Sequence, residues 1–387
     1  MFKILTLNNI SPRGLALFPE DRYQCSNDVS DPDAILVRSQ VMHEMTFGPG
    51  LKAVGRAGAG VNNIPINVLS DRGVPVFNTP GANANAVKEL VIAGLLLSAR
   101  NIPAALNFVG GLEGDDEYLH REVEAGKKRF VGTELPGRTL GVIGLGAIGV
   151  RVANAAHALG MRVIGFDPKI TVQSAWQLSS GVEQASSVEE VLAKSEFVTF
   201  HVPLNEHTRN MLSRERLARV RDGSVVLNFA RDGVVDADVI REGLDSGKLG
   251  GYVSDFPNNQ LKKRPNVIAL PHLGASTREA EENCAVMAVS QIRDYLENGN
   301  IVNSVNFPET ILPHTEGYRL CIANANVVNM LGQISSELAK SDLNILDMLN
   351  KSKGDLAYTV VDVDKPITEQ ALDHIRSIEG VLAVRTV

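Results

Sequence analysis

Cysteine is scarce in this sequence, and its three copies follow no pattern. Cys25, Cys284 and Cys321 are far apart along the chain and include no CxxC pair. That spacing argues against a disulfide framework and against a zinc site, and such sparing use of cysteine is typical of a reducing compartment. We therefore expect a cytoplasmic protein without a metal site.

Long hydrophobic runs and an excess of positive charge are also lacking. The longest apolar candidate, Leu90 to Leu97, is too short for a membrane span. The first residues, Met1 to Leu7, lack a signal-peptide layout and predict a buried strand. A net charge of −7 argues against nucleic acid or an anionic membrane as a partner. A locally basic site could still bind an anionic substrate.

The composition is that of a globular protein, with 44% hydrophobic and 21% charged residues. A chain of 387 residues is too long for one ordinary core, so two or three domains are expected. Short apolar segments alternate with helical segments, which predicts parallel sheets with helices on their faces. Strands are expected at residues 2–7, 34–37, 52–55, 74–77, 139–143, 162–166, 197–201, 225–229, 251–253 and 267–270.

Long helices are expected at residues 85–99 and 276–297. The first has few polar residues and should be buried, in part against a partner subunit. The second could cross back to the first domain. Residues 110–136 are predicted to form a helix and a connection. Residues 306–316, which include two prolines, are predicted to form a linker.

The last seventy residues have a pattern of their own. Their predicted order is strand, helix, strand, strand, helix, strand, which is the ferredoxin-like βαββαβ order. The fold class is therefore α/β, with two Rossmann-like doubly wound parallel-sheet domains and a C-terminal ferredoxin-like domain. The elements are expected at residues 319–323, 328–340, 343–349, 358–363, 367–378 and 381–387.

A G-x-G-x-x-G sequence begins at Gly144, after an expected strand and before an alanine-rich helix. Gly144 permits a tight turn, Gly146 lets the backbone approach a pyrophosphate, and Gly149 lets helix and strand pack closely. Asp167 follows at the end of the next strand and can accept both ribose hydroxyls of NAD, although Lys169 is nearby. We predict NAD as the cofactor; a glycine turn without a ligand is the alternative.

Two later strand ends carry residues suited to hydride-transfer chemistry. Arg231 follows an apolar strand, and its guanidinium could bind a substrate carboxylate and the adjacent carbonyl oxygen. His272 follows another strand and could exchange a proton with the carbonyl oxygen. Taken alone, each could instead be an ordinary residue at a strand end.

Together these motifs resemble the D-2-hydroxyacid dehydrogenases over nearly the whole chain. The motifs that carry the resemblance are, in order, the glycine sequence with Asp167, His201-Val202-Pro203-Leu204 with Thr208, Ala230-Arg231, Val235-Asp236 and Pro271-His272. The resemblance implies a substrate-binding domain at residues 1–98 and 283–305, an NAD-binding domain at 99–282, a linker at 306–316 and a regulatory domain at 317–387. It also implies an active site in the cleft between the first two domains.

The family's functional residues transfer to matching positions here. Arg231 would bind and polarise the substrate, His272 would act as general acid and base, and Asp255 would contact the nicotinamide carboxamide. The cofactor-binding positions implied are Thr79, Gly144, Gly146, Ala147, Ile148, Gly149, Asp167, His201, Val202, Pro203, Thr208, Ala230, Arg231, Asp255, His272 and Gly274.

One feature of the family is missing. A glutamate normally follows the aspartate and pairs with the histidine, but residues 257–264 contain none. We hypothesise that Asn259 or Gln260 orients His272 through an amide, with Asp232 as the other candidate partner. The alternative is a divergent surface loop and impaired catalysis.

Two arginines point to a phosphorylated substrate. Arg38, next to Ser39, and Arg56 each follow a strand of the first domain, where two cations and a hydroxyl could bind a phosphate. Structural salt bridges are the alternative role. Residues 55–65 resemble a subset of phosphoglycerate dehydrogenases. The substrate positions implied are Arg38, Ser39, Arg56, Ala57, Gly58 and Asn78.

The C-terminal unit resembles an ACT domain, a module that pairs between subunits and binds amino acids at the joint. The resemblance implies L-serine as an effector and a homodimer or homotetramer. Asn326 and Asn344 match effector-contacting positions, whereas Asn324 stands where a histidine is usual. A purely oligomerising domain is the alternative.

The expected function is NAD-dependent oxidation of 3-phospho-D-glycerate to 3-phosphohydroxypyruvate, the first step of serine biosynthesis. The alternatives are another D-2-hydroxyacid dehydrogenase, for glycerate, lactate or 2-hydroxyglutarate, and a non-catalytic NAD-sensing binding protein.

Overall fold

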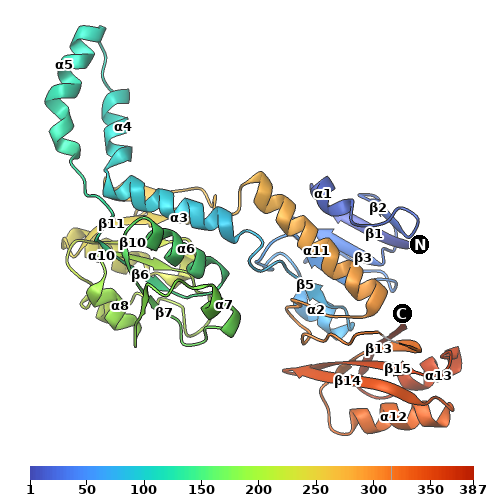
Figure 1. The fold of residues 1–387 in the computed structure, drawn as a ribbon. Coiled ribbons are helices and arrows are strands. Elements are labelled where there is room, and N and C mark those ends of the chain that lie inside the picture. The colour runs from blue at the N-terminus through green and yellow to red at the C-terminus, as the bar shows by residue number, and fades with distance from the viewer. Residues whose placement is uncertain (315) are drawn as a thin grey trace. The chain divides into compact units, whose positions relative to one another are not determined.

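The computed structural model describes residues 1–314 and 316–387. Contacts divide the chain into two compact units. Unit 1 comprises Met1–Asn83 and Arg278–Val387, and unit 2 comprises Ala84–Thr277. The elements of both units are labelled in Figure 1, and each unit is described by itself.

Unit 1 contains a five-stranded parallel sheet in the order β2-β1-β3-β4-β5. The edge strand β2 was not predicted, because it is short and half of it is exposed. The long helix α11 packs on this sheet through Ala288 and Ile292, which are fully buried. The elements are β1 (Phe2–Leu7), α1 (Pro12–Leu15), β2 (Tyr23–Ser26), β3 (Ala34–Val37), β4 (Ala53–Arg56), α2 (Ile66–Asp71), β5 (Val76–Phe77) and α11 (Arg278–Asn298).

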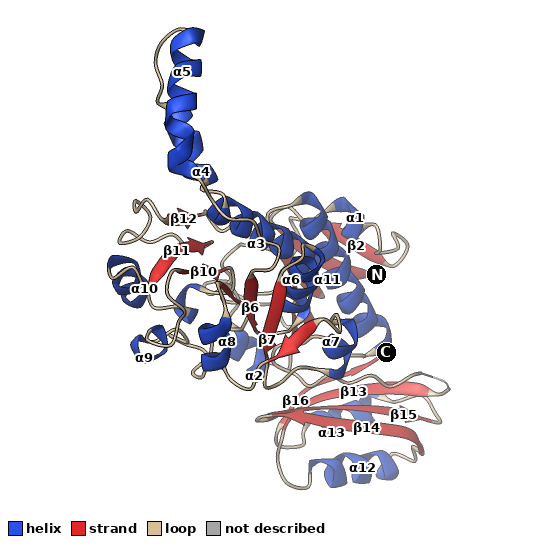
Figure 2. Cartoon of the chain, turned by 60° about the vertical axis from the view of Figure 1, so that its left-hand side comes forward, coloured by secondary structure: helices blue, strands red, loops and turns tan. Residues whose placement is uncertain are grey.

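The C-terminal part of unit 1 has the predicted βαββαβ order, which is confirmed. Its four strands pair antiparallel in the order β14-β15-β13-β16. Figure 2 shows α12 along one face of this sheet, and a core of apolar side chains joins the sheet to α12 and α13. The elements are β13 (Tyr318–Ala325), α12 (Met330–Lys340), β14 (Ile345–Lys353), β15 (Leu356–Val363), α13 (Glu369–Arg376) and β16 (Val381–Thr386).

The segment predicted as a linker is packed into unit 1 instead of bridging two bodies. Phe307 is 1% exposed and lies in the same apolar core as α11. Thr310 pairs with Ile301 in an antiparallel bridge, and Val305 donates its N–H to the carbonyl of Val76. Proline in the sequence indicated a loop, but it does not determine whether a loop is exposed. Residue 315 of the predicted linker lies outside the described residues.

Side chains of the C-terminal sheet hold the last turn of α11. Arg319 donates to Asp362 through Nε and Nη2, both at 2.7 Å, and its Nη1 donates to the carbonyl oxygens of Asn298 at 2.9 Å and Leu312 at 2.8 Å. The hydroxyl of Tyr358 donates to Gly299 O at 2.9 Å. The bonds to Asn298 O and Gly299 O satisfy carbonyl groups that the end of α11 leaves without partners.

Unit 2 is built around a seven-stranded parallel sheet in the order β12-β11-β10-β9-β6-β7-β8, much of which can be followed in Figure 2. The Rossmann-type fold is confirmed. The short strand β8 was not predicted. The strands are β6 (Thr139–Ile143), β7 (Arg162–Phe166), β8 (Val182–Gln184), β9 (Phe197–Phe200), β10 (Ser224–Asn228), β11 (Leu249–Ser254) and β12 (Val267–Ala269).

Helix α3 belongs to unit 2, although the sequence placed the boundary after residue 98. Its buried residues Val87, Val91 and Leu95 share an apolar core with α6 and the central strands. The helices of unit 2 are α3 (Ala84–Ala99), α4 (Ile102–Gly110), α5 (Asp116–Gly126), α6 (Ala147–Ala158), α7 (Val172–Gln177), α8 (Val188–Lys194), α9 (Arg214–Leu217) and α10 (Ala237–Asp245), with 3-10 turns at Lys127–Phe130 and Asp232–Val234.

Helices α4 and α5 project from the rest of unit 2 (Figure 1). The sequence predicted one helix between residues 110 and 136 and missed α4. In α4, whose residues are all described, no side chain is buried, and Leu106 is 66% exposed. Among the described residues, no single helix is long and apolar enough to cross a membrane; only α3 and α4 together, bent by 67°, meet such a test of length and composition.

We predict that Asp362→Ala destabilises unit 1 by about 3–5 kcal/mol, because it leaves the buried Arg319 without its counter-ion. Hydrogen exchange of the β13 and β15 amides measures the change. Asp373→Ala is the matched control: its partner Arg376 is exposed, so the cost should stay below about 1 kcal/mol. Equal effects of the two substitutions would contradict the role of the buried pair.

Candidate functional site

The predicted site residues of unit 2 gather at one edge of the seven-stranded sheet. All its strands are parallel, so their carboxyl ends share this edge, which is where ligands of open α/β sheets bind. The sequence prediction of a shared edge is therefore confirmed by the strand order. The residues that follow strands here are Gly144 (after β6), Asp167 (β7), His201 (β9), Arg231 (β10), Asp255 (β11) and His272 (β12).

The glycine turn has the tight turn at Gly144 and the close packing at Gly149 that its sequence predicted. Gly144 has a φ of +93°, and a Cβ there would lie 2.6 Å from the carbonyl oxygen of His201. A Cβ on Gly149 would lie 1.9 Å from the Gly144 carbonyl oxygen, so helix and turn touch. At Gly146, by contrast, no described atom lies within 4 Å of the Cβ position.

The open side of Gly146 fits a pyrophosphate. Gly146 precedes α6 and caps it without a side chain, and both Gly146 and Ala147 are exposed. The first N–H groups of α6, at Ala147, Ile148 and Gly149, thus remain available with the positive end of the helix dipole. The residues present therefore suit a dinucleotide phosphate.

Asp167 is positioned by the glycine turn itself. Its Oδ2 accepts from the N–H of Leu145 at 2.8 Å, and its Oδ1 accepts from the N–H of Lys169 at 2.8 Å. A carboxylate has further lone pairs, so these bonds fix its orientation and still allow it to accept ribose hydroxyls.

Residues 201–208 form a self-supporting loop beside the glycine turn. The hydroxyl of Thr208 donates to Pro203 O and accepts from the N–H of Asn205 at 2.8 Å, so it stabilises the loop. The ring of His201 contacts the hydroxyl of Thr199 at 3.0 Å, and burial lowers the pKa of His201 to about 3. His201 is therefore neutral at physiological pH, and Pro203 is exposed at the edge.

The turn that carries His272 is held by Asp255. The Oδ1 of Asp255 accepts from Leu273 N at 2.7 Å and its Oδ2 from Gly274 N at 2.8 Å. His272 itself donates its N–H to Asp255 O at 3.1 Å and has a φ of +58°, which a residue with a side chain rarely adopts. Asp255 is 2% exposed, so its carboxylate is committed to this turn.

The turn that carries Arg231 has a similar anchor, which the sequence reasoning missed. Asn228 is fully buried; its side chain accepts from Ala230 N at 3.1 Å and donates to Arg231 O at 3.0 Å. A polar residue at the end of an apolar strand was the available signal. Arg231 is exposed, and its Nη1 donates to Ala230 O at 2.7 Å.

Arg231 and His272 lie on the same edge with β11 between their strands. Asn228, Ser254 and Ala269 are aligned in register, and both functional residues follow three positions later. Two strand spacings amount to roughly 10 Å. That separation leaves room for a small substrate between the two side chains.

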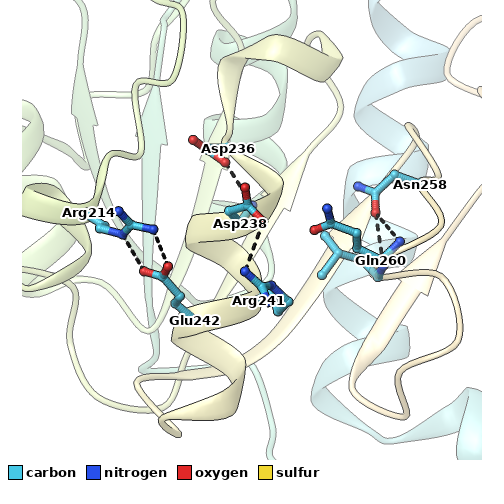
Figure 3. A network of polar contacts seen from close by, with 8 residues as sticks. Arg214, Asp236, Asp238, Arg241, Glu242, Asn258 and Gln260 are labelled. Atoms are coloured by element: carbon cyan, nitrogen blue, oxygen red, sulfur yellow. Dashed lines mark hydrogen bonds and ion pairs between the residues drawn. The ribbon is translucent and has the colours of Figure 1, made fainter.

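Among the described residues, the predicted partners of His272 make no hydrogen bond to its side chain. Asn259, Gln260 and Asp232 are exposed, and none is hydrogen-bonded to the imidazole. The rings of His272 and Phe256 instead form a T-shaped contact, with centroids 5.1 Å apart. In Figure 3, the side chain of Asn258 accepts from the N–H of Gln260, which builds a local turn. The amide partner of His272 stays a prediction.

In unit 1, the predicted substrate residues also meet at a sheet edge. Arg38 follows β3, and Arg56 is the last residue of the neighbouring strand β4. The Nε of Arg56 donates to Arg38 O at 3.1 Å. Arg38 forms an ion pair with Glu281 of α11 at 2.7 Å, so the salt-bridge alternative is realised for Arg38. Glu281 was missed by the sequence analysis, because it lies far from Arg38 in the chain.

The remaining predicted positions of unit 1 lie in the segments that follow β3, β4 and β5. The side chain of Asn78 donates to Ala59 O at 2.6 Å, and Thr79 donates its N–H to Gly58 O at 3.1 Å. Thr79 is fully buried, so it does not face solvent in this unit. Ser39 donates its N–H to Asn8 Oδ1 at 2.9 Å, and Ala57 is buried.

The three predicted effector residues do not converge within one chain. Asn324 is buried and bonds to Ala325 O, and Asn326 bonds to Gly354 O, both at one end of the C-terminal sheet. Asn344 precedes β14 at the opposite end, because Ile345 pairs with Val363 and Lys353 with Leu356. A shared effector site would need residues from more than one copy of the chain.

We predict that Gly149→Ala destabilises unit 2 by about 1–3 kcal/mol, because its Cβ would collide with a backbone oxygen. Gly146→Ala should leave the melting temperature unchanged and weaken NADH binding about tenfold, which corresponds to roughly 1.4 kcal/mol. Circular dichroism and NADH fluorescence measure the two effects. Unchanged NADH affinity in Gly146→Ala would contradict the phosphate position.

Comparisons with known proteins agree with this geometry. Residues 104–274 match the family described as D-isomer specific 2-hydroxyacid dehydrogenase, NAD binding domain. The D-3-phosphoglycerate dehydrogenase of Haemophilus influenzae is 34% identical over 350 residues, which cover 87% of this chain and 81% of that protein. The one of Methanocaldococcus jannaschii is 35% identical over 87% of this chain, which spans only 63% of that longer protein.

A solved structure supports the same relation. The 3-phosphoglycerate dehydrogenase of Entamoeba histolytica, bound to NAD+, is 26% identical and superposes with a TM-score of 0.61 over 79% of this chain and 98% of that chain. A D-mandelate dehydrogenase of Rhodotorula graminis, 22% identical with a TM-score of 0.67 over 81% of this chain and 99% of that chain, shares the fold. This chain belongs to the D-isomer specific 2-hydroxyacid dehydrogenase family, and its unit 2 contains that family's NAD-binding domain.

Proposed function

We propose that this chain oxidises 3-phospho-D-glycerate to 3-phosphohydroxypyruvate with NAD, the first step of serine biosynthesis. The observation that carries the proposal is the shared edge on which the glycine turn, Arg231 and His272 follow parallel strands. Relatives named D-3-phosphoglycerate dehydrogenase, 32–36% identical over most of the chain, favour this substrate within the family.

Each residue on the edge has a part in the proposed reaction. The exposed guanidinium of Arg231 binds the substrate carboxylate and the oxygen on C2, and it stabilises negative charge there. His272 accepts the proton of the C2 hydroxyl during oxidation and returns it in the reverse direction. NAD, when bound, supplies the hydride acceptor.

The two turns that carry these side chains must be rigid for this chemistry. Asp255 ties Leu273 and Gly274, and Asn228 ties Ala230 and Arg231, so the backbone on both sides of the substrate is fixed. Catalytic groups gain rate when the surrounding structure holds them in place. Asp255 thus acts here as a positioning residue, and the predicted contact with the nicotinamide carboxamide stays part of the proposal.

The phosphate of the substrate is assigned to Arg38 and Arg56. The ion pair of Arg38 with Glu281 is partly exposed, with 34% and 43% of the two side chains accessible, so an incoming phosphate dianion can replace the carboxylate. A simple hydroxy acid without phosphate would leave this pair undisturbed. This difference would favour the phosphorylated substrate.

The alternatives concern the same site. A dehydrogenase of glycerate, lactate or 2-hydroxyglutarate would use Arg231 and His272 without the two arginines of unit 1. A non-catalytic NAD-sensing protein would explain the missing carboxylate partner of His272. Both catalytic side chains remain exposed on the proposed reaction edge, which supports an enzyme.

The C-terminal part is proposed to be an ACT-like regulatory domain that binds L-serine between subunits. Its βαββαβ topology supports this, and so do the positions of Asn326 and Asn344 at opposite ends of the sheet, which pairing of two copies could bring together. The exposed apolar side chains of α4, including Leu106 and Val109, support a homodimer or homotetramer.

NADH consumption with 3-phosphohydroxypyruvate, hydroxypyruvate, pyruvate and 2-oxoglutarate tests the proposal. We expect the highest kcat/KM with 3-phosphohydroxypyruvate. Arg38→Ala should lower this kcat/KM about 10- to 100-fold and should change the kcat/KM with hydroxypyruvate little. Arg13→Ala, which removes a comparable pair with Glu282 of α11, is the control and should change neither. No NADH consumption with any substrate would favour the NAD-sensing alternative.

We predict that L-serine at millimolar concentration lowers the rate, and that Asn326→Ala and Asn344→Ala each raise the half-inhibitory concentration about tenfold, as loss of one good hydrogen bond would. Initial rates over a serine titration measure this. Asn298→Ala, which removes an exposed side chain that donates to Asp294, is the control. If serine neither binds nor inhibits, the result contradicts the effector site and favours a purely oligomerising domain.

A further inference from the structure

A polar pocket of about 660 Å³ lies in unit 1, apart from the residues that the proposed function uses. One wall is the end of β14, and the other is the segment that leads from α11 toward β13. The residues on which its chemistry depends are Asn303, Ser304, Glu309, Asn350, Lys351 and Lys353. This volume lies within the range of sites for small molecules.

The two lysines are on the face of the sheet that packs against the end of α11. Lys351 is paired in register with Tyr358, and residues directly opposite on paired strands share a face. Tyr358 is buried on that face, where its hydroxyl reaches Gly299 O. Lys353 lies two residues further along the same face, and its Nζ donates to Ser304 O at 3.0 Å.

Lys351 is the unusual member of this pair. Its side chain is exposed at the pocket, and among the described parts of the chain its ammonium has no hydrogen bond and no ion pair. Glu309, the acidic residue that lines the pocket, is exposed and likewise has no ion pair within residues 1–314 and 316–387. Two ammonium groups against one carboxylate leave the pocket with a net positive charge.

The floor of the pocket is rigid before any ligand arrives. Ser304 is buried, and its hydroxyl donates to Asn306 Oδ1 at 3.0 Å and accepts from Phe307 N at 3.1 Å. Ser304 also forms an antiparallel bridge with Phe77 of β5. A preformed floor lowers the entropic cost of binding.

We propose that this pocket binds a small, multiply charged anion that carries carboxylate or phosphate groups, with Lys351 and Lys353 as its cationic contacts. Charge-assisted hydrogen bonds from two lysines favour such an anion over chloride.

The pocket lies next to the proposed substrate-binding residues of unit 1. Asn303, which lines the pocket, accepts at its carbonyl oxygen from the N–H of Asn78 at 3.3 Å. Asn78 in turn holds the loop at Ala59.

Isothermal titration calorimetry on the full chain tests the proposal, with inorganic phosphate and succinate as separate probes and sodium chloride at matched ionic strength as the reference. Lys351→Gln/Lys353→Gln should weaken binding of the preferred anion about tenfold or more. Lys128→Gln, which makes the same charge change on an exposed turn of unit 2, should bind as the unaltered chain does. Anions that bind at the glycine turn or to Arg38 contribute the same binding heat in all three proteins, so they do not affect the comparison.

A preference for phosphate or for succinate identifies the group that the pocket recognises. Lys351→Gln alone breaks no hydrogen bond among residues 1–314 and 316–387, so it serves as the test if the double variant unfolds. The proposal is overturned if the unaltered chain binds neither anion beyond the chloride reference. It is equally overturned if the lysine variants bind both anions as tightly as the unaltered chain does, in which case Lys353 only anchors the β14–β15 hairpin.

Discussion

The parallel register of unit 2 is the constraint on which its whole site depends. Because β6, β7, β9, β10, β11 and β12 all run in the same direction, the residues after them emerge on one edge of the sheet. Gly144, Asp167, Arg231 and His272 are spread over 129 positions of the sequence (144 to 272), yet each is only one to three residues beyond a strand end. A reversal of any one strand would carry its residue to the opposite edge.

Strand direction alone would not orient the side chains, and buried polar groups complete the arrangement. Asp255 and Asn228 are buried. Asp255 accepts from two N–H groups of the turn after β12, and Asn228 accepts from Ala230 N and donates to Arg231 O in the turn after its own strand. Buried polar groups are costly without partners, so these turns have one favourable conformation. The positive φ of His272 is tolerated because Asp255 accepts from the backbone N–H groups of His272 and of the two residues that follow it.

Unit 1 relies on a different constraint, the end of helix α11. Its last carbonyl groups need donors, and Arg319, Tyr358 and Arg385 of the C-terminal sheet supply them. Arg319 is also neutralised by a bidentate contact with Asp362, which makes its burial tolerable. Because the other end of α11 carries Glu281, the partner of Arg38, one helix connects the C-terminal sheet with the proposed phosphate-binding residues.

The sequence by itself determined the local features: the alternation of strands and helices, the glycine turn, the acid after the next strand, and the βαββαβ order at the C-terminus. Those features follow from backbone chemistry and hydrophobic period, which act over a few residues. The strands β2 and β8 were not predicted because they are short and only partly buried, so they lack an apolar pattern. Only the tertiary structure decided that Glu281 pairs with Arg38, that Asp255 is committed to the His272 turn, and that the proline-containing segment around Phe307 is core. These depend on contacts between residues far apart in the chain, for which no local pattern of amino acids carries a signal.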